Sequence, residues 1–190
     1  LYEYQVGFFY IDSSYIESNV CFAELNESDN TIIDDEFENY SSFQSDIGEW
    51  QNIDQDESTV YSLPGYEYQN QGDESGFLVF EPGTITPPLN LSITGEKCLV
   101  SFASIIPPSS DLIISPAFQA SRVDVDVYLK SYDTTWGMER VKCGLMFNND
   151  EDNIFYFNEG NYFEITTEMT HLNFLHQSTN VEDVITNFWL

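Results

Sequence analysis

The sequence predicts an all-β fold, built as a sandwich of two antiparallel sheets. Short runs rich in aromatic and β-branched residues alternate with clusters of Gly, Pro, Asn, Asp and Ser, and long helical periodicity is nearly absent. The 190 residues suit one such domain, or one domain with a fragment of another. A hydrophobic content of 42% is enough to build a core, so a disordered chain is not expected.

The clearest predicted strand spans residues 123–129. Its three valines and Leu129 point to one face, and Asp124, Asp126 and Tyr128 point to the other. We therefore expect the first set to be buried and the two aspartates to be exposed or paired. The other runs with strand character are residues 4–10, 18–24, 76–81, 97–104, 112–119, 139–146, 154–157, 161–166 and 184–189.

Three stretches rich in proline, glycine or serine, residues 64–75, 82–96 and 107–110, are predicted to be loops. Long loops between short strands are typical of jelly rolls, in which the strands are scaffold and the loops carry binding. The predicted fold class is therefore a jelly-roll β-sandwich.

The acidic, polar run at residues 26–30 predicts a linker. We expect residues 1–31 to be the terminal strands of a preceding β-sandwich with this linker, and residues 32–190 to be the jelly roll. In the alternative, the early strands add to the main sandwich, because two strands are marginal alone. The chain starts inside a predicted strand, so we expect it to be a mature or trimmed piece of a longer protein.

The charge is extreme, with 33 acidic residues against 5 Lys and Arg and a formal net charge of −28. Such a surface repels phosphate backbones and anionic membranes, so nucleic acid is excluded as an expected partner. No transmembrane run or signal peptide is visible, and membrane insertion is not expected. Divalent cations and neutral or basic partners remain. Alternatively, the charge serves only solubility.

The chain has three cysteines, Cys21, Cys98 and Cys143, so at least one of them has no partner within the chain. One disulfide could form in three ways. The favoured interpretation is that they are buried free thiols that act as small hydrophobes.

Acidic side chains gather in two places, residues 34–38 and the stretch that holds Asp54, Asp56 and Glu57. Calcium takes about six to eight oxygen ligands, and carboxylates from two separated loops can supply them. In a chain this acidic, a solvated acidic surface accounts for the same pattern.

Aromatic side chains in predicted loops are candidates for stacking on a sugar. Trp136, in a turn before a glycine, is the first of them, and Tyr132, Tyr66 and Tyr68 are the others. Core packing is the alternative for each. Trp50 follows a glycine and is expected to start a strand and to pack in the core.

Catalysis has little support in the sequence. The two histidines lack a third zinc ligand, no serine lies in a Gly-x-Ser-x-Gly elbow, and no glycine-rich phosphate loop is present. A glycoside hydrolase that uses two carboxylates remains an alternative, because the many acids offer many pairs.

Several short motifs, taken in order, carry a resemblance to a known family. They are Phe37-Glu38, Trp50, Ile53-Asp54-Gln55-Asp56, Asp111-Leu112-Ile113-Ile114-Ser115-Pro116, Tyr128-Leu129-Lys130-Ser131 and Gly137-Met138-Glu139-Arg140. Over residues 36–146 they resemble the cleaved-adhesin / choice-of-anchor J jelly-roll domains of secreted bacterial surface proteins. Residues 1–25 are similar to the last strands of a fibronectin type III domain.

The resemblance implies a structural calcium ion, with Glu38 and Asp183 as first ligands and Asp54 and Asp56 as secondary ones. Two departures bear on this set. The tryptophan that the family places before Leu112 is absent, and the loop after Asp56 continues with glutamate where the family often has glycine.

The resemblance also implies a function. We expect a non-catalytic binding or adhesion module of a secreted or cell-surface bacterial protein, part of a multidomain chain, that recognises a glycan or a host protein. The alternatives are the glycoside hydrolase named above and a structural spacer without a ligand.

Overall fold

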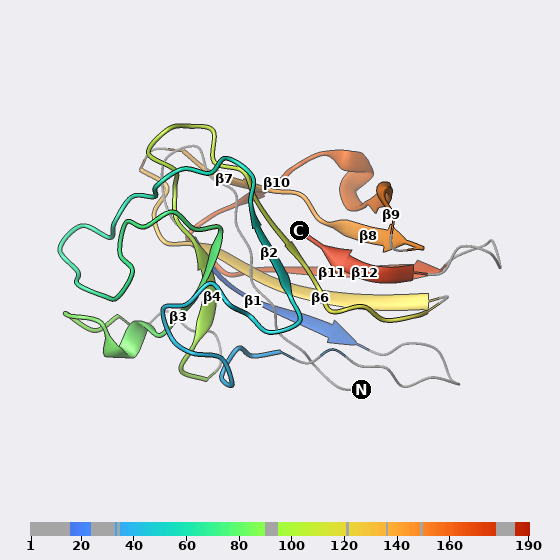
Figure 1. The fold of residues 1–190 in the computed structure, drawn as a ribbon. Helices are drawn as coiled ribbons and strands as arrows, with labels where there is room; N and C mark the ends of the chain where they lie inside the picture. Colours follow the sequence, from blue (N-terminus) through green and yellow to red (C-terminus); the bar gives the residue numbers. More distant parts are fainter. Residues whose placement is uncertain are drawn as a thin grey trace.

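The computed structural model describes residues 16–23, 33, 35–89, 95–120, 122–135, 137–148, 150–177 and 185–190, of which 16–23, 151 and 189 are described as backbone only. The described part forms twelve strands and two short 3-10 turns (Figure 1). The strands are β1 (Ile16–Ala23), β2 (Gln51–Asp54), β3 (Phe77–Phe80), β4 (Cys98–Ser101), β5 (Asp111–Ile114), β6 (Arg122–Ser131), β7 (Glu139–Val141), β8 (Gly144–Phe147), β9 (Asp150–Tyr156), β10 (Phe163–Ile165), β11 (Thr170–Gln177) and β12 (Ile185–Trp189). The turns are η1 (Pro82–Thr84) and η2 (Phe157–Gly160).

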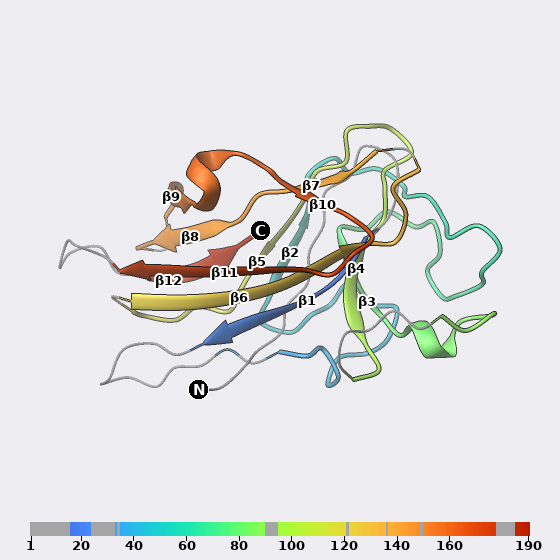
Figure 2. The same cartoon turned by 180° about the vertical axis from the view of Figure 1, so that it is seen from behind.

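The strands form two five-stranded antiparallel sheets and one pair. The first sheet has the order β11-β6-β1-β4-β3, and the second has the order β2-β5-β12-β8-β9. The pair is β10 with β7. Figure 2 shows β11, β6 and β1 running alongside one another. The all-β prediction is confirmed.

Strand β6 has the predicted alternation. Its three valines and Leu129 are at most 1% exposed, whereas Asp124 and Asp126 are half-buried and both accept hydrogen bonds from the Asn173 side-chain amide. The prediction of a buried and a paired face is therefore confirmed.

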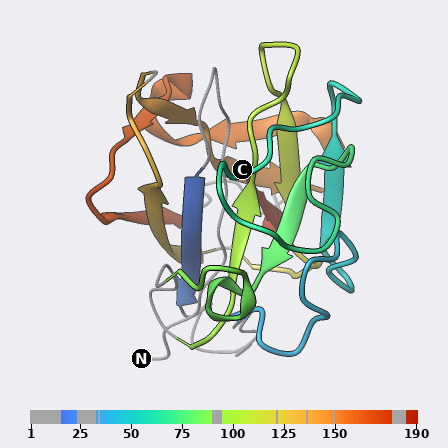
Figure 3. The same cartoon turned by 90° about the vertical axis from the view of Figure 1, so that its left-hand side faces the viewer.

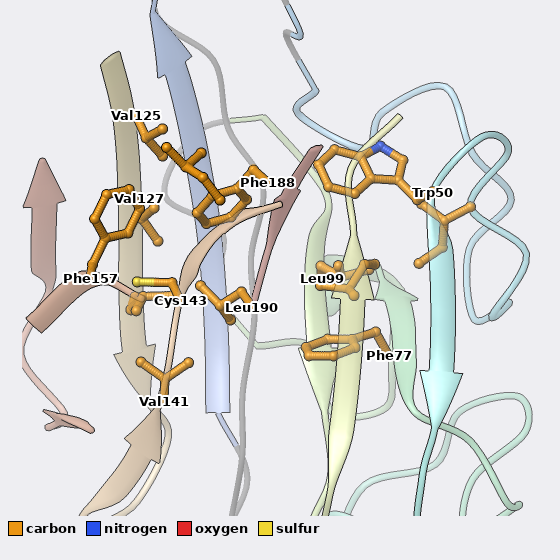
Figure 4. Close-up of a cluster of buried hydrophobic side chains, with 14 of the residues drawn as sticks. Trp50, Phe77, Leu99, Val125, Val127, Val141, Cys143, Phe157, Phe188 and Leu190 are labelled. Carbon is orange, nitrogen blue, oxygen red and sulfur yellow. The ribbon is translucent and has the colours of Figure 1, made fainter. Parts of the chain in front are cut away.

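The core lies between the two five-stranded sheets. Figure 4 shows Val125 and Val127 of β6 in one cluster with Phe188 of β12, while Phe77 and Leu99 extend it toward Trp50. Removing such side chains from water is the main stabilising term, at about 1.5–3 kcal/mol for each large apolar side chain. Trp50 is 5% exposed, as expected for a core residue.

Cys98 and Cys143 are both buried, as predicted, and form no disulfide with another cysteine whose side chain is described. They belong to different apolar clusters, and burial raises the pKa of the Cys143 thiol. The side chain of Cys21 lies outside the described residues.

Strands β2 and β11 were not among the predicted strands, and the predicted strand at residues 4–10 lies outside the described residues. Strand β1 pairs with both β6 and β4, so it occupies a place inside the first sheet. The predicted boundary at residues 31 and 32 lies where residues are not described.

Candidate functional site

Strand pairing brings together two aspartates that are far apart in the sequence. Asp54 ends β2, Asp111 begins β5, and the two are direct partners in the antiparallel register. Side chains that are opposite in such a pair lie on the same face with their Cβ atoms about 4.5–5.5 Å apart, and like charges there are destabilising. Asp111 Oδ2 accepts a hydrogen bond from the buried Ser101 hydroxyl of the other sheet at 2.5 Å.

Asp56 joins this pair from the turn that follows β2. Its Oδ1 accepts the Ser104 hydroxyl and its Oδ2 accepts the Ser110 N–H, both at 2.6 Å. The turn itself is held by Asp54 Oδ1, which accepts the N–H groups of Asp56 at 3.2 Å and Glu57 at 2.8 Å. The loop between β4 and β5 is thereby fixed to the carboxylates.

The three carboxylates form one cluster. One oxygen each from Asp54, Asp56 and Asp111 lie within 4.8 Å of one another, which is close enough for all three to bind one metal ion. Asp54 Oδ2 is buried and accepts no hydrogen bond from the described residues. A buried acceptor without a partner costs about 1–3 kcal/mol, so this oxygen is the least satisfied atom of the cluster.

The environment disfavours charge on two of the three acids. The pKa of Asp111 is raised to about 8, chiefly by burial and in part by the charges of Asp54 and Asp56, against the lowering effect of the Ser101 hydrogen bond. Burial also raises the pKa of Asp54, against the lowering effect of the Glu57 N–H. A divalent cation would lower both pKa values, because its charge stabilises the ionised carboxylates.

The neighbouring contact between the sheets is polar. Asn52 Nδ2 donates to the Phe77 carbonyl at 2.7 Å, and the Phe77 N–H donates to Asn52 Oδ1 at 2.8 Å. Asn52 therefore pairs with β3 as a backbone segment would. A Cβ at Gly76 would lie 2.8 Å from Asn52 Oδ1, so this close approach requires glycine.

Glu38, a predicted first ligand, lies in another contact. Its Oε1 accepts the N–H groups of Glu96 at 2.6 Å and Lys97 at 2.9 Å, and Lys97 Nζ donates to the Glu38 and Tyr40 carbonyls. Glu38 thus anchors the segment before β4 and is not a member of the carboxylate cluster. Asp183, the other predicted first ligand, lies outside the described residues.

The predicted stacking residues are spread over the structure. Tyr66, Tyr68 and Tyr132 are half-buried against a second apolar cluster on β3 and β4. Tyr68 stacks on Phe102 with 5.7 Å between ring centroids. Trp136 lies outside the described residues.

Of the four predicted ligands, the structure brings together Asp54 and Asp56. The third member of the cluster, Asp111, was not a predicted ligand. In the sequence analysis it only marked the position before Leu112, where the resembled family has tryptophan. The signal that could have found it is the strand pairing of residues 53–54 with residues 111–112.

The chain matches no protein-family model, no curated protein and no solved structure. Among the described residues, no helix is long and apolar enough to span a membrane.

Proposed function

We propose that this chain is a non-catalytic binding module that holds a calcium ion at Asp54, Asp56 and Asp111. The observation that carries the proposal is the convergence of three carboxylates, one of which, Asp54, has a buried Oδ2 without a hydrogen-bond partner among the described residues. An ion there would neutralise the repulsion between Asp54 and Asp111 and would tie β2 to β5.

The donor set favours a hard cation. All three side chains offer oxygen, and calcium prefers carboxylate and carbonyl oxygens, whereas zinc and copper favour nitrogen and sulfur. Two oxygens on opposite sides of a calcium ion lie about 4.6–5.2 Å apart, because each Ca–O distance is about 2.3–2.6 Å. The upper limit of 4.8 Å between the three oxygens is compatible with this spacing.

The binding role follows from the charge and from the resemblance described above. We propose a jelly-roll module of a secreted or cell-surface protein, in which the calcium ion holds the loops that recognise a glycan or an extracellular protein. The net charge of −28 favours neutral or basic partners.

Calcium binding is tested by thermal unfolding and calorimetric titration, first with EDTA and then with added calcium. At a calcium concentration of 100 times Kd, mass action predicts a gain of about 2.7 kcal/mol in unfolding free energy. The double variant Asp54→Asn, Asp111→Asn should lose this gain. Asp152→Asn, which removes a charge from the exposed edge strand β9, should keep it. An unchanged melting temperature in wild type would contradict the proposal.

A glycoside hydrolase is the second candidate, and one observation favours it. Asp111, with a pKa of about 8, would be a protonated acid at neutral pH beside Asp54 and Asp56. The oxygens are, however, closer than the spacing of about 5–5.5 Å between the two carboxyls of retaining enzymes. Hydrolysis of a glycan panel that Asp111→Asn abolishes would support the enzyme and contradict the binding module.

A further inference from the structure

The loop between β4 and β5 exposes an apolar tip. Ile105 is 46% exposed and Ile106 is 72% exposed, the highest value among the large apolar side chains that the structure describes. Pro107 and Pro108 are also exposed. Figure 3 shows this yellow-green loop projecting beyond the ends of the neighbouring strands. Consecutive apolar side chains at a projecting tip indicate a contact surface, because they contribute nothing to the core.

The limb that leads into the tip is held by backbone pairing. The Tyr61 N–H donates to the Ala103 carbonyl at 2.7 Å, and the Ile105 N–H donates to the Thr59 carbonyl at 2.9 Å. Tyr61 is itself 49% exposed, so its ring enlarges the apolar surface at the base of the loop.

The limb that leads out of the tip is held by the carboxylate turn. The Gln55 N–H donates to the Ser110 carbonyl at 2.8 Å, and the Ser110 N–H donates to Asp56. A further bond inside the loop, from the Ser104 N–H to the Ser109 hydroxyl at 2.6 Å, ties the two limbs together. The tip is therefore presented in one conformation, which lowers the entropy cost of binding.

Two acidic side chains lie at the base of this loop. Asp56 accepts hydrogen bonds from both limbs of the loop. Glu74 forms an isolated β-bridge with Thr59, and the Thr59 carbonyl in turn accepts the Ile105 N–H. The charge of Glu74 also acts on Asp54. Glu74 is exposed and the chain carries a net charge of −28, so a matching partner has an apolar pocket with a positive rim.

We propose that residues 104–110 and Tyr61 form a docking loop for a protein partner that offers an apolar pocket rimmed by Lys or Arg. The proposal rests on the binding module proposed above and names its partner class. A second copy of this chain is disfavoured by the charge of −28 on each copy. A glycan is disfavoured because the side chains at the tip, Ile105 to Pro108, offer it no hydrogen bond and no aromatic ring.

The test uses the full chain and a phage-displayed library of ankyrin-repeat domains with a randomised concave face. Domains selected on the wild-type chain are measured against Ile106→Asp and against Leu175→Asp. Leu175 is a matched control because it is 58% exposed on β11, outside the loop. If Ile106→Asp fails to fold, the milder Ile106→Ser replaces it.

The proposal expects selected domains in which Lys or Arg surround apolar residues. Their affinity should fall roughly tenfold or more with Ile106→Asp and stay unchanged with Leu175→Asp. Affinity that is insensitive to Ile106→Asp, or equally sensitive to both variants, would overturn the proposal. So would sedimentation of the chain with phosphatidylcholine vesicles that Ile106→Asp abolishes, because the partner would then be a lipid surface.

Calcium titration separates this proposal from the previous one. Ile106→Asp should bind calcium as the wild type does, since the Ile106 side chain makes no contact that the carboxylates need. If the wild type binds no calcium but the selected domains still depend on Ile106, only the calcium site is contradicted. If calcium binds but the domains ignore Ile106, only the docking loop is contradicted.

Discussion

The two five-stranded sheets are joined in opposite ways at their two pairs of edge strands. On one side, which we call the polar junction, Asn52 links β2 to β3 and the carboxylates of Asp54, Asp56 and Asp111 meet the loop after β4. On the other side, which we call the aromatic junction, rings at β9 and η2 pack against rings of β11. The Phe157 and Phe174 rings stack at 4.0 Å, and the Phe155 and His176 rings lie 4.4 Å apart.

The difference indicates which side serves function. The aromatic junction gains stability from apolar area alone. The polar junction places like charges in one half-buried cluster and leaves an oxygen of Asp54 without a hydrogen-bond partner among the described residues, which costs stability unless a cation is bound. If the polar junction served only to hold the two sheets together, apolar residues would be sufficient there. We therefore expect substitutions at the two junctions to differ in kind, and three experiments test this.

The largest expected effect is at the aromatic junction. Phe157→Ala removes a ring that is 6% exposed and leaves a cavity against Phe174, so we expect a loss of about 3–5 kcal/mol in unfolding free energy. Urea denaturation measures it. Phe155→Ala is the matched control, because the Phe155 ring is 42% exposed and its removal should cost clearly less. Equal losses in the two variants would contradict a junction that depends on buried area.

The next effect is a pH dependence at the polar junction in the presence of EDTA. Because the folded-state pKa of Asp111, about 8, lies above its ordinary value, the folded chain holds a proton that the unfolded chain has released. This contribution is fully present below about pH 4 and is lost as the pH rises toward 8. We expect the unfolding free energy to fall by about 2.7 kcal/mol between pH 5 and pH 7.

Urea denaturation at several pH values measures this slope. Asp111→Asn should flatten it, because the amide does not titrate, and Asp152→Asn should leave it unchanged. A slope that survives in Asp111→Asn would mean that other groups cause it. Calcium should oppose the loss, since it favours the ionised carboxylate.

The sequence predicted the strands that have a regular pattern. The alternation at residues 123–129 predicted both the buried face of β6 and its polar face, because side chains alternate across a strand. Strand β11 carries the same period in part, but Leu175 on its outer face interrupts the pattern. Strand β2 is only four residues long and has one apolar residue, so beyond the strand start expected at Trp50 no alternating pattern marks it.

The site could be predicted only in part, for a similar reason. Asp54 and Asp56 are close in sequence and belong to a recognisable motif, whereas Asp111 joins them through strand pairing across a long stretch of chain. Local propensity does not encode such a register. Glu38 shows the converse, because its acidic neighbours made it a candidate ligand although its carboxylate holds two backbone N–H groups.

The smallest expected effect is a second pH dependence, of opposite sign, at the aromatic junction. Burial against Phe155 and Phe147 lowers the pKa of His176. The unfolded chain therefore takes up a proton first as the pH falls, and this contribution to stability is present above about pH 6.5 and lost below it. Because the ring is only half-buried, solvent screening keeps the effect smaller than the other two. The measurement compares urea midpoints at pH 7.5 and pH 5.5 for His176→Gln, in an Asp111→Asn background that removes the larger opposing slope. His176→Gln should lose less stability on acidification than its parent does. If both variants lose the same unfolding free energy on acidification, protonation of His176 does not destabilise the aromatic junction. The two junctions then do not differ in the sign of their pH response.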